Sequence, residues 1–273
     1  MTHPKSPLSA PLSRRGLLTA GALFLGAGLG APSQAQTAQG GEAGEAGAVD
    51  GLDPQVGFLV LLGLFDATYR IAGELQALGQ TALAAEHLEF SHHAHYEDIA
   101  DGVIARGFAP FEDQTHAYAA ALGTGEDAQA RLAGLLDIVA TIRASEGAAH
   151  RMHADEVLLR IAGNDYAGGV EAGQVLAEQE YHDAWGFTQS ARADLEALSQ
   201  QPEPVAAAAL RALRALEPTA ALFPGLLATE IAPEAAEGTA CALFFTARAR
   251  APAVLAPSSK SSSVTASCRA SSA

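Results

Sequence analysis

The chain has 273 residues, of which 49% are hydrophobic and 17% charged, and its formal net charge is −15. Phosphate binding depends on clustered lysine and arginine, so this strongly acidic balance excludes nucleic acid as an expected partner. A negative chain attracts cations, which makes metal ions the partners that the composition favours.

Residues 1–35 have the features of an export signal. The pair Arg14-Arg15 precedes an apolar, Gly- and Ala-rich run that starts at Leu17, and small residues end the segment at 33–35. This order resembles a twin-arginine signal, which a receptor reads. A general secretory signal that happens to contain two arginines is the alternative. We expect a protein exported to the periplasm or the exterior, with no membrane anchor in its mature form, because no later stretch reaches 18 apolar residues.

The composition of residues 36–50 indicates a flexible acidic linker. Beyond it, apolar residues recur with helical spacing and predict a four-helix bundle over residues 51–200. Breaks that contain glycine separate the helices, and the short connections favour antiparallel neighbours. The four helices are expected at 54–79, 83–106, 127–162 and 166–199.

The composition changes after the bundle. A short amphipathic helix is expected at 205–216, within an extension of helix and loop that covers 201–245. Residues 246–273 are basic and serine-rich without any acidic residue, which indicates a disordered tail. An out-of-frame C-terminus would give the same abrupt shift. Cys241 and Cys268 lie far from the histidines, so we expect neither as a metal ligand, although an oxidising compartment would let them pair.

Histidine is confined to one part of the mature chain. Apart from His3, every histidine lies within residues 87–182. At about 100° per residue, the second expected helix places His92 and His95 on its apolar stripe, with Glu89 at the edge of the stripe. We therefore expect these side chains to point inward.

The third expected helix carries polar residues at successive positions of its apolar stripe, namely Glu146, His150 and His153. Burying a carboxylate and two imidazoles without partners would cost several kcal/mol, which is comparable to the whole stability of a domain. A bound cation with ligands from other helices would compensate this cost.

The first and fourth expected helices each add candidates. Asp66 lies between apolar residues of the first helix and is expected to point inward. Glu178 and His182 form an i, i+4 pair on the flank of the apolar face of the fourth helix. The other histidines of this region are expected at the surface: His87, His93 and His116.

These residues resemble the ferritin-like family of carboxylate-bridged dimetal bundles, in which two helices each give a Glu and two each give a Glu-x-x-His motif. The resemblance covers about 54–199 and implies an all-α, antiparallel four-helix bundle with a short extra C-terminal helix. It also implies a di-iron centre for metal handling, iron oxidation or stress protection. Its implied ligands are Asp66, Glu146, the Glu89-Phe-Ser-His92 motif, and Glu178 with His182.

Some residues depart from this family pattern. Asp66 is one methylene shorter than the expected Glu, and the last motif spans four residues rather than three. The imidazoles of His95, His150 and His153 have no place in the pattern. Imidazole favours zinc, copper or nickel more than carboxylate does. The bound metal could therefore be zinc or copper as well as iron or manganese.

Other functions are compatible with the sequence. A metal-free helical envelope or desiccation-related interaction protein would pair its histidines with glutamates. Haem ligation lacks a Cys-x-x-Cys-His motif, and a DNA-protecting miniferritin is opposed by export and by net charge. The chain has no nucleophile triad or phosphate-binding glycine loop, so only a ferroxidase-like or other oxidoreductase activity stays open. A homo-oligomer is also compatible with the sequence.

Overall fold

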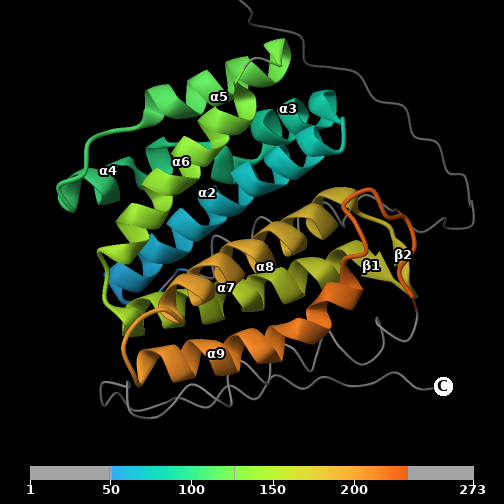
Figure 1. Cartoon of the computed structure of the whole chain (residues 1–273). Helices are drawn as coiled ribbons and strands as arrows, with labels where there is room; N and C mark the ends of the chain where they lie inside the picture. The colour runs from blue at the N-terminus through green and yellow to red at the C-terminus, as the bar shows by residue number, and fades with distance from the viewer. Residues whose placement is uncertain (1–48, 50, 126, 233–273) are drawn as a thin grey trace, which may run out of the picture. The chain divides into compact units, whose positions relative to one another are not determined.

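The computed structural model describes residue 49 and residues 51–125 and 127–232 (Figure 1). The predicted export signal, nearly all of the linker, the basic tail and both cysteines lie outside the described residues.

The prediction of an all-α chain with a helical bundle is confirmed for the described residues, which are mostly helical. A two-stranded antiparallel hairpin, β1 (Val170–Glu171) and β2 (Gln174–Val175), follows α7. Two short 3-10 helices are η1 (His92–Ala94) and η2 (Glu217–Leu222). The α-helices are α2 (Pro54–Ala77), α3 (Thr81–Phe90), α4 (Glu97–Ala105), α5 (Glu112–Thr124), α6 (Ala128–Ala144), α7 (Ala148–Gly169), α8 (Glu178–Leu198) and α9 (Val205–Leu216).

Helix α2 is the central element of the core. It packs against α7 and α8 on one side and against α3, α4 and α6 on another, while α9 lies against α8 (Figure 1). Asp53 caps its first turn by accepting a hydrogen bond from the Gln55 backbone N–H at 2.8 Å, and Pro54 occupies the first helical position. Among the described residues, α2 is the one helix long and apolar enough to cross a membrane, and most of it is buried inside the protein. The apolar faces of α2 are thus explained by packing inside the protein core.

The prediction of one continuous helix over 83–106 is wrong. Helix α3 ends at Phe90, and Ser91 takes an extended conformation (φ −75°, ψ 121°). The Ser91 side chain accepts a hydrogen bond from the His93 backbone N–H at 3.3 Å and starts η1. A serine that offers the backbone this alternative competes with the helix. Counting about 100° per residue therefore no longer predicts which way a side chain points beyond Phe90.

The third expected helix, 127–162, is interrupted in the same way. Helix α6 ends at Ala144, and Gly147 has extended backbone (φ −64°, ψ 138°) before α7 begins. The break expected near residue 163 does not occur, because α7 continues to Gly169. Helix α5 lies within residues that were expected to form only a connection between the second and third helices.

Candidate functional site

Most of the predicted metal ligands do not point into the bundle. The breaks at Ser91 and at 145–147 precede His92, His95, His150 and His153, so counting from the apolar stripe misplaced these histidines. Within the described ranges, no group of three or more His, Cys, Asp or Glu residues is arranged to hold a metal ion. A resident di-iron centre therefore does not fit this donor set. The exposed residues are Glu89, His92, His95, His153 and Glu178, while Glu146 and His150 are half-buried.

Asp66 lies inside the bundle as expected, with only 3% of its surface exposed. Its carboxylate accepts hydrogen bonds from Arg70, one turn further along α2, at 2.6 Å from Nε and 3.3 Å from Nη2. The half-buried Glu146 is also bound by an arginine. Its carboxylate pairs with Arg106, the residue that follows α4, and the Arg106 guanidinium lies 3.6 Å from the centre of the Phe58 ring. Both carboxylates form ion pairs with arginine, and they do not converge with the other predicted ligands on a metal position.

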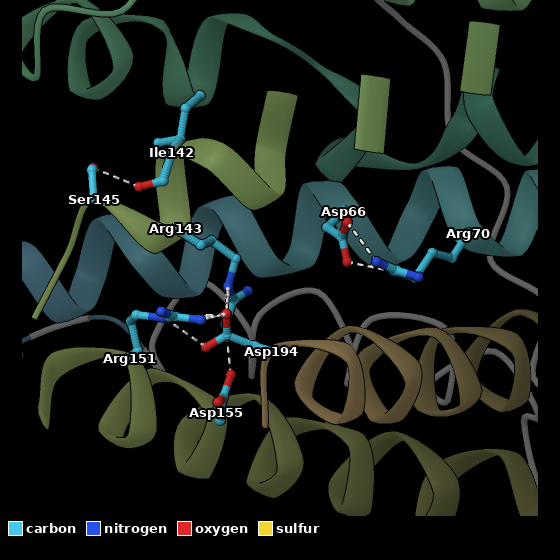
Figure 2. A network of polar contacts seen from close by, with 8 residues as sticks. All are labelled: Asp66, Arg70, Ile142, Arg143, Ser145, Arg151, Asp155 and Asp194. Atoms are coloured by element: carbon cyan, nitrogen blue, oxygen red, sulfur yellow. Dashed lines mark hydrogen bonds and ion pairs between the residues drawn. The ribbon is translucent and has the colours of Figure 1, made fainter. Parts of the chain in front are cut away.

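Four charged side chains meet in the interior of the bundle (Figure 2). Arg143 comes from the end of α6, Arg151 and Asp155 from α7, and Asp194 from α8. Arg151 donates to Oδ1 of Asp194 at 2.6 Å from Nη2, and from Nε to both carboxylate oxygens at 3.2 Å. Arg143 donates from Nη2 to Oδ1 of Asp155 at 2.6 Å, and its Nε lies 3.2 Å from Oδ1 of Asp194. We call these four residues the charge network.

The two carboxylates of the charge network differ in their protonation. Burial alone raises the pKa of Asp194, but Arg143 and Arg151 outweigh it and hold the pKa below its ordinary value of 3.8. Burial raises the pKa of Asp155 well above that value, against the pull of Arg143 and with the help of the Asp194 charge. Asp194 is thus the anion that both arginines share, and Asp155 favours its neutral form.

Sequence reasoning missed the charge network because it followed histidine and glutamate. A usable signal was present, since Arg151 and Asp155 lie four residues apart in α7 and therefore share one face of the helix. The neighbouring helix also makes room for the network. A Cβ atom on Gly63 of α2 would lie 2.9 Å from Nη1 of Arg143 and 2.4 Å from a methyl carbon of Leu158. Glycine at this position lets α2 approach the arginine closely.

A second group of polar side chains joins α3 to α8, and we call it the histidine cluster: His87, His182 and Asp183. The prediction that His87 lies at the surface is wrong, because its side chain is only 5% exposed. Its Nε2 atom is 3.7 Å from Oδ1 of Asp183, and its ring centre is 6.2 Å from that of His182. His182 is buried as well, and its Nε2 atom lies 2.9 Å from the backbone oxygen of Leu226.

Both imidazoles of the histidine cluster favour the neutral form. Burial, together with the smaller effects of the nearby His182 and His93, lowers the pKa of His87 to about 4. Burial also lowers the pKa of His182, against the opposing effects of Leu226 and Glu178. Neutral imidazole is the form that binds metal ions. The buried histidine cluster therefore offers neutral ring nitrogens as ligands, whereas the ionised carboxylate of the charge network is already bound by two guanidinium groups.

The described helices form an all-α bundle with a charged interior, and one comparison with known families agrees with such a fold. Residues 142–225 match the sequence model of the iron permease-associated 4-helix bundle domain. The matched residues contain the whole charge network together with His182 and Asp183, whereas His87 lies before them. This region is therefore similar to a helical bundle linked to iron, and the match is not to a ferritin-like family. No curated protein matches the chain, and no solved structure matches it.

Proposed function

We propose that this protein is an exported, iron-handling helical bundle that serves iron transport at the cell envelope. The observation that carries the proposal is the match of residues 142–225 to an iron permease-associated bundle. The acidic net charge of −15 supports it, because such a chain concentrates cations around itself. The twin-arginine-like segment supports a place outside the cytoplasm, where iron arrives before transport.

In this proposal iron is cargo and not a resident cofactor. A cofactor site needs several donors fixed in place, and the described residues offer no group of three. Asp66 is bound by Arg70, and the charge network fills the interior between α6, α7 and α8 with two guanidinium groups. Arginine repels a cation and cannot give up its proton to become a ligand. Iron would instead bind reversibly at donors outside the charge network.

The binding half of the proposal is tested with the purified mature chain, residues 36–273. The protein is equilibrated with Fe(II) without oxygen, and bound iron is measured by elemental analysis after dialysis. The expected result is at least one ion per chain, removable by a chelator without loss of helical circular dichroism. Protein that retains no iron above the chelated control would contradict iron handling.

The export half has its own test. Residues 1–35 are fused to a reporter protein that is active only after export in a folded state. Replacement of Arg14 and Arg15 by lysine should abolish export if the segment is a twin-arginine signal. Unchanged export by the double variant would show a different route, and no export of the original fusion would contradict the envelope location.

The charge network also supports a second candidate, a metal-free helical bundle that serves as an interaction protein of the envelope. Its observation is that the buried charges are paired within the protein: Arg143 and Arg151 share Asp194. In this case iron and chelator would both leave the melting temperature unchanged. In the iron-handling case, iron raises the melting temperature because it binds the folded chain.

A further inference from the structure

We propose that His87 and Asp183 are the two protein ligands of a reversible binding site for a divalent transition-metal ion. The choice of Fe(II) as the natural ion rests on the proposed function, whereas the site itself rests on the geometry of the histidine cluster. The two residues come from different helices, α3 and α8, so the ion would join two elements that are far apart in the chain.

The first observation is an unmatched nitrogen in a buried position. The His87 side chain is only 5% exposed, and within the described residues its Nε2 atom has no hydrogen-bond partner. Buried polar atoms are nearly always hydrogen-bonded, so an exception needs an explanation. Asp183 lies 3.7 Å away, which is too far for a hydrogen bond between Nε2 and Oδ1.

The second observation is that 3.7 Å suits two donors on one ion. Typical metal–nitrogen and metal–oxygen distances are both about 2.1 Å, so one ion would bridge this gap with a nitrogen–metal–oxygen angle of about 125°. An imidazole with a carboxylate is a donor pair that binds Fe(II), Mn(II), Co(II) and Zn(II). The remaining coordination positions would be filled by water, which makes the site open and the ion exchangeable.

His182 is a neighbour of the two proposed ligands, and its hydrogen bond fixes which ring nitrogen carries the proton. The backbone oxygen of Leu226 can only accept a hydrogen bond, so Nε2 of His182 must carry the proton at 2.9 Å. The lone pair of the neutral ring is then on Nδ1. A histidine with one nitrogen held by a carbonyl in this way is the usual arrangement around metal ions in proteins.

Glu178 connects the histidine cluster to solvent. Its side chain is 61% exposed, and its Oε1 atom lies 3.8 Å from Nε2 of His182. The ring centre of His182 is in turn 6.2 Å from that of His87. An exposed carboxylate that attracts cations therefore lies close to the buried imidazoles.

The test uses the mature chain and Co(II) as an oxygen-stable probe, followed by Fe(II) without oxygen. Affinity is measured by titration of the Co(II) absorption bands for the wild type, His87→Leu, Asp183→Asn and the control His116→Gln, which changes an exposed histidine of α5. The inference predicts that His87→Leu and Asp183→Asn weaken the tightest site at least about tenfold, as loss of a ligand should. The control should bind like the wild type.

The outcomes separate this inference from the proposed function. Wild-type affinity in both His87→Leu and Asp183→Asn would overturn the site but leave iron handling standing, with iron bound elsewhere. Absence of Co(II) and Fe(II) binding by the wild type would overturn both. If either variant fails to fold, histidine NMR spectra of the wild type decide. Co(II) should then broaden the ring signals of His87 before that of His116, and equal broadening would contradict the site.

Discussion

The charge network and the histidine cluster are both buried and polar, yet they are completed in different ways. In the charge network, Arg143 and Arg151 converge on Asp194, so protein groups supply the compensating charge. In the histidine cluster, both imidazoles favour the neutral form and Nε2 of His87 has no hydrogen-bond partner within the described residues. The charge network is held together by ion pairs, although Nε and Nη1 of Arg143 and Oδ2 of Asp155 also make no hydrogen bond within the described residues. The histidine cluster instead offers a neutral ring nitrogen as a metal ligand.

The largest effect is expected from Asp194→Asn. This substitution keeps the shape of the side chain but leaves Arg143 and Arg151 without their shared anion. Breaking a buried ion pair from one side typically costs about 3–5 kcal/mol, because the remaining charge is buried without compensation. The free energy of unfolding from urea titration should fall by that order. A loss below about 1 kcal/mol would contradict the central position given to Asp194.

Asp155→Asn is the matched test within the same network, and we expect it to cost about 1 kcal/mol or less at neutral pH. Burial already favours the uncharged form of Asp155, and an amide resembles that form. A loss as large as that of Asp194→Asn would show that Asp155 is ionised in the folded protein.

The contributions of Asp194 and Asp155 to the free energy of unfolding are expected to depend on pH in opposite directions. Asp194 has a lowered pKa, so its stabilisation is present above the ordinary value of 3.8 and is lost as pH falls below it. The stability gap between wild type and Asp194→Asn should therefore narrow in acid. Asp155 has a raised pKa, so its contribution is lost as pH rises, and Asp155→Asn should gain on the wild type toward neutral pH. Urea titrations between pH 3 and pH 7 measure both trends, and parallel curves would contradict them.

Arg106→Ala should have an intermediate effect of about 1–2 kcal/mol. Arg106 stacks on Phe58, pairs with Glu146 and donates to the Gly102 backbone oxygen at 3.0 Å. Partial exposure limits the value of the ion pair, so the stacking and packing of the long side chain make up much of the effect. The control is Arg160→Ala on the exposed side of α7, which should stay within about 0.5 kcal/mol. Equal losses for the two variants would contradict a specific role for Arg106.

A similarly small effect on stability is expected from His87→Leu, at about 1 kcal/mol or less in metal-free protein. Leucine fills a similar space and removes a buried nitrogen that makes no hydrogen bond. This result would set the histidine cluster apart from the charge network as a part of the molecule that the fold does not need. A loss of about 3 kcal/mol or more would instead make His87 a structural residue.

The sequence predicted the helices best where a single apolar stripe continues without competition. Helix α2 begins at the predicted residue, and α9 spans the predicted 205–216. The prediction failed where one polar or small residue offers the backbone another conformation, as Ser91 and Gly147 do. Each short interruption changes which face the following residues occupy. Continuous helices predicted that His92, His95 and His153 would point inward. Because of these interruptions, all three are exposed.

The buried polar groups were harder to predict than the helices. Asp66 is buried as its helical position indicated, but it binds an arginine. His182 was expected only on the flank of the apolar face and is buried as well. Arg143 and Arg151 are buried because they meet Asp155 and Asp194 from other turns and helices, and such pairing is a property of the tertiary arrangement. His87 becomes buried only because α3 packs its C-terminal turn near α8. Periodicity within one helix contains no information on these partners.

Iron binding by the purified mature chain tests the central claim most directly. Fe(II) is titrated without oxygen into the wild type, Asp194→Asn and His87→Leu, under conditions where each variant is folded, and bound iron is counted after dialysis. The account predicts that the wild type and Asp194→Asn bind iron and that His87→Leu loses the tightest site. Iron that is absent from the wild type, or that depends on Asp194 and not on His87, would contradict it.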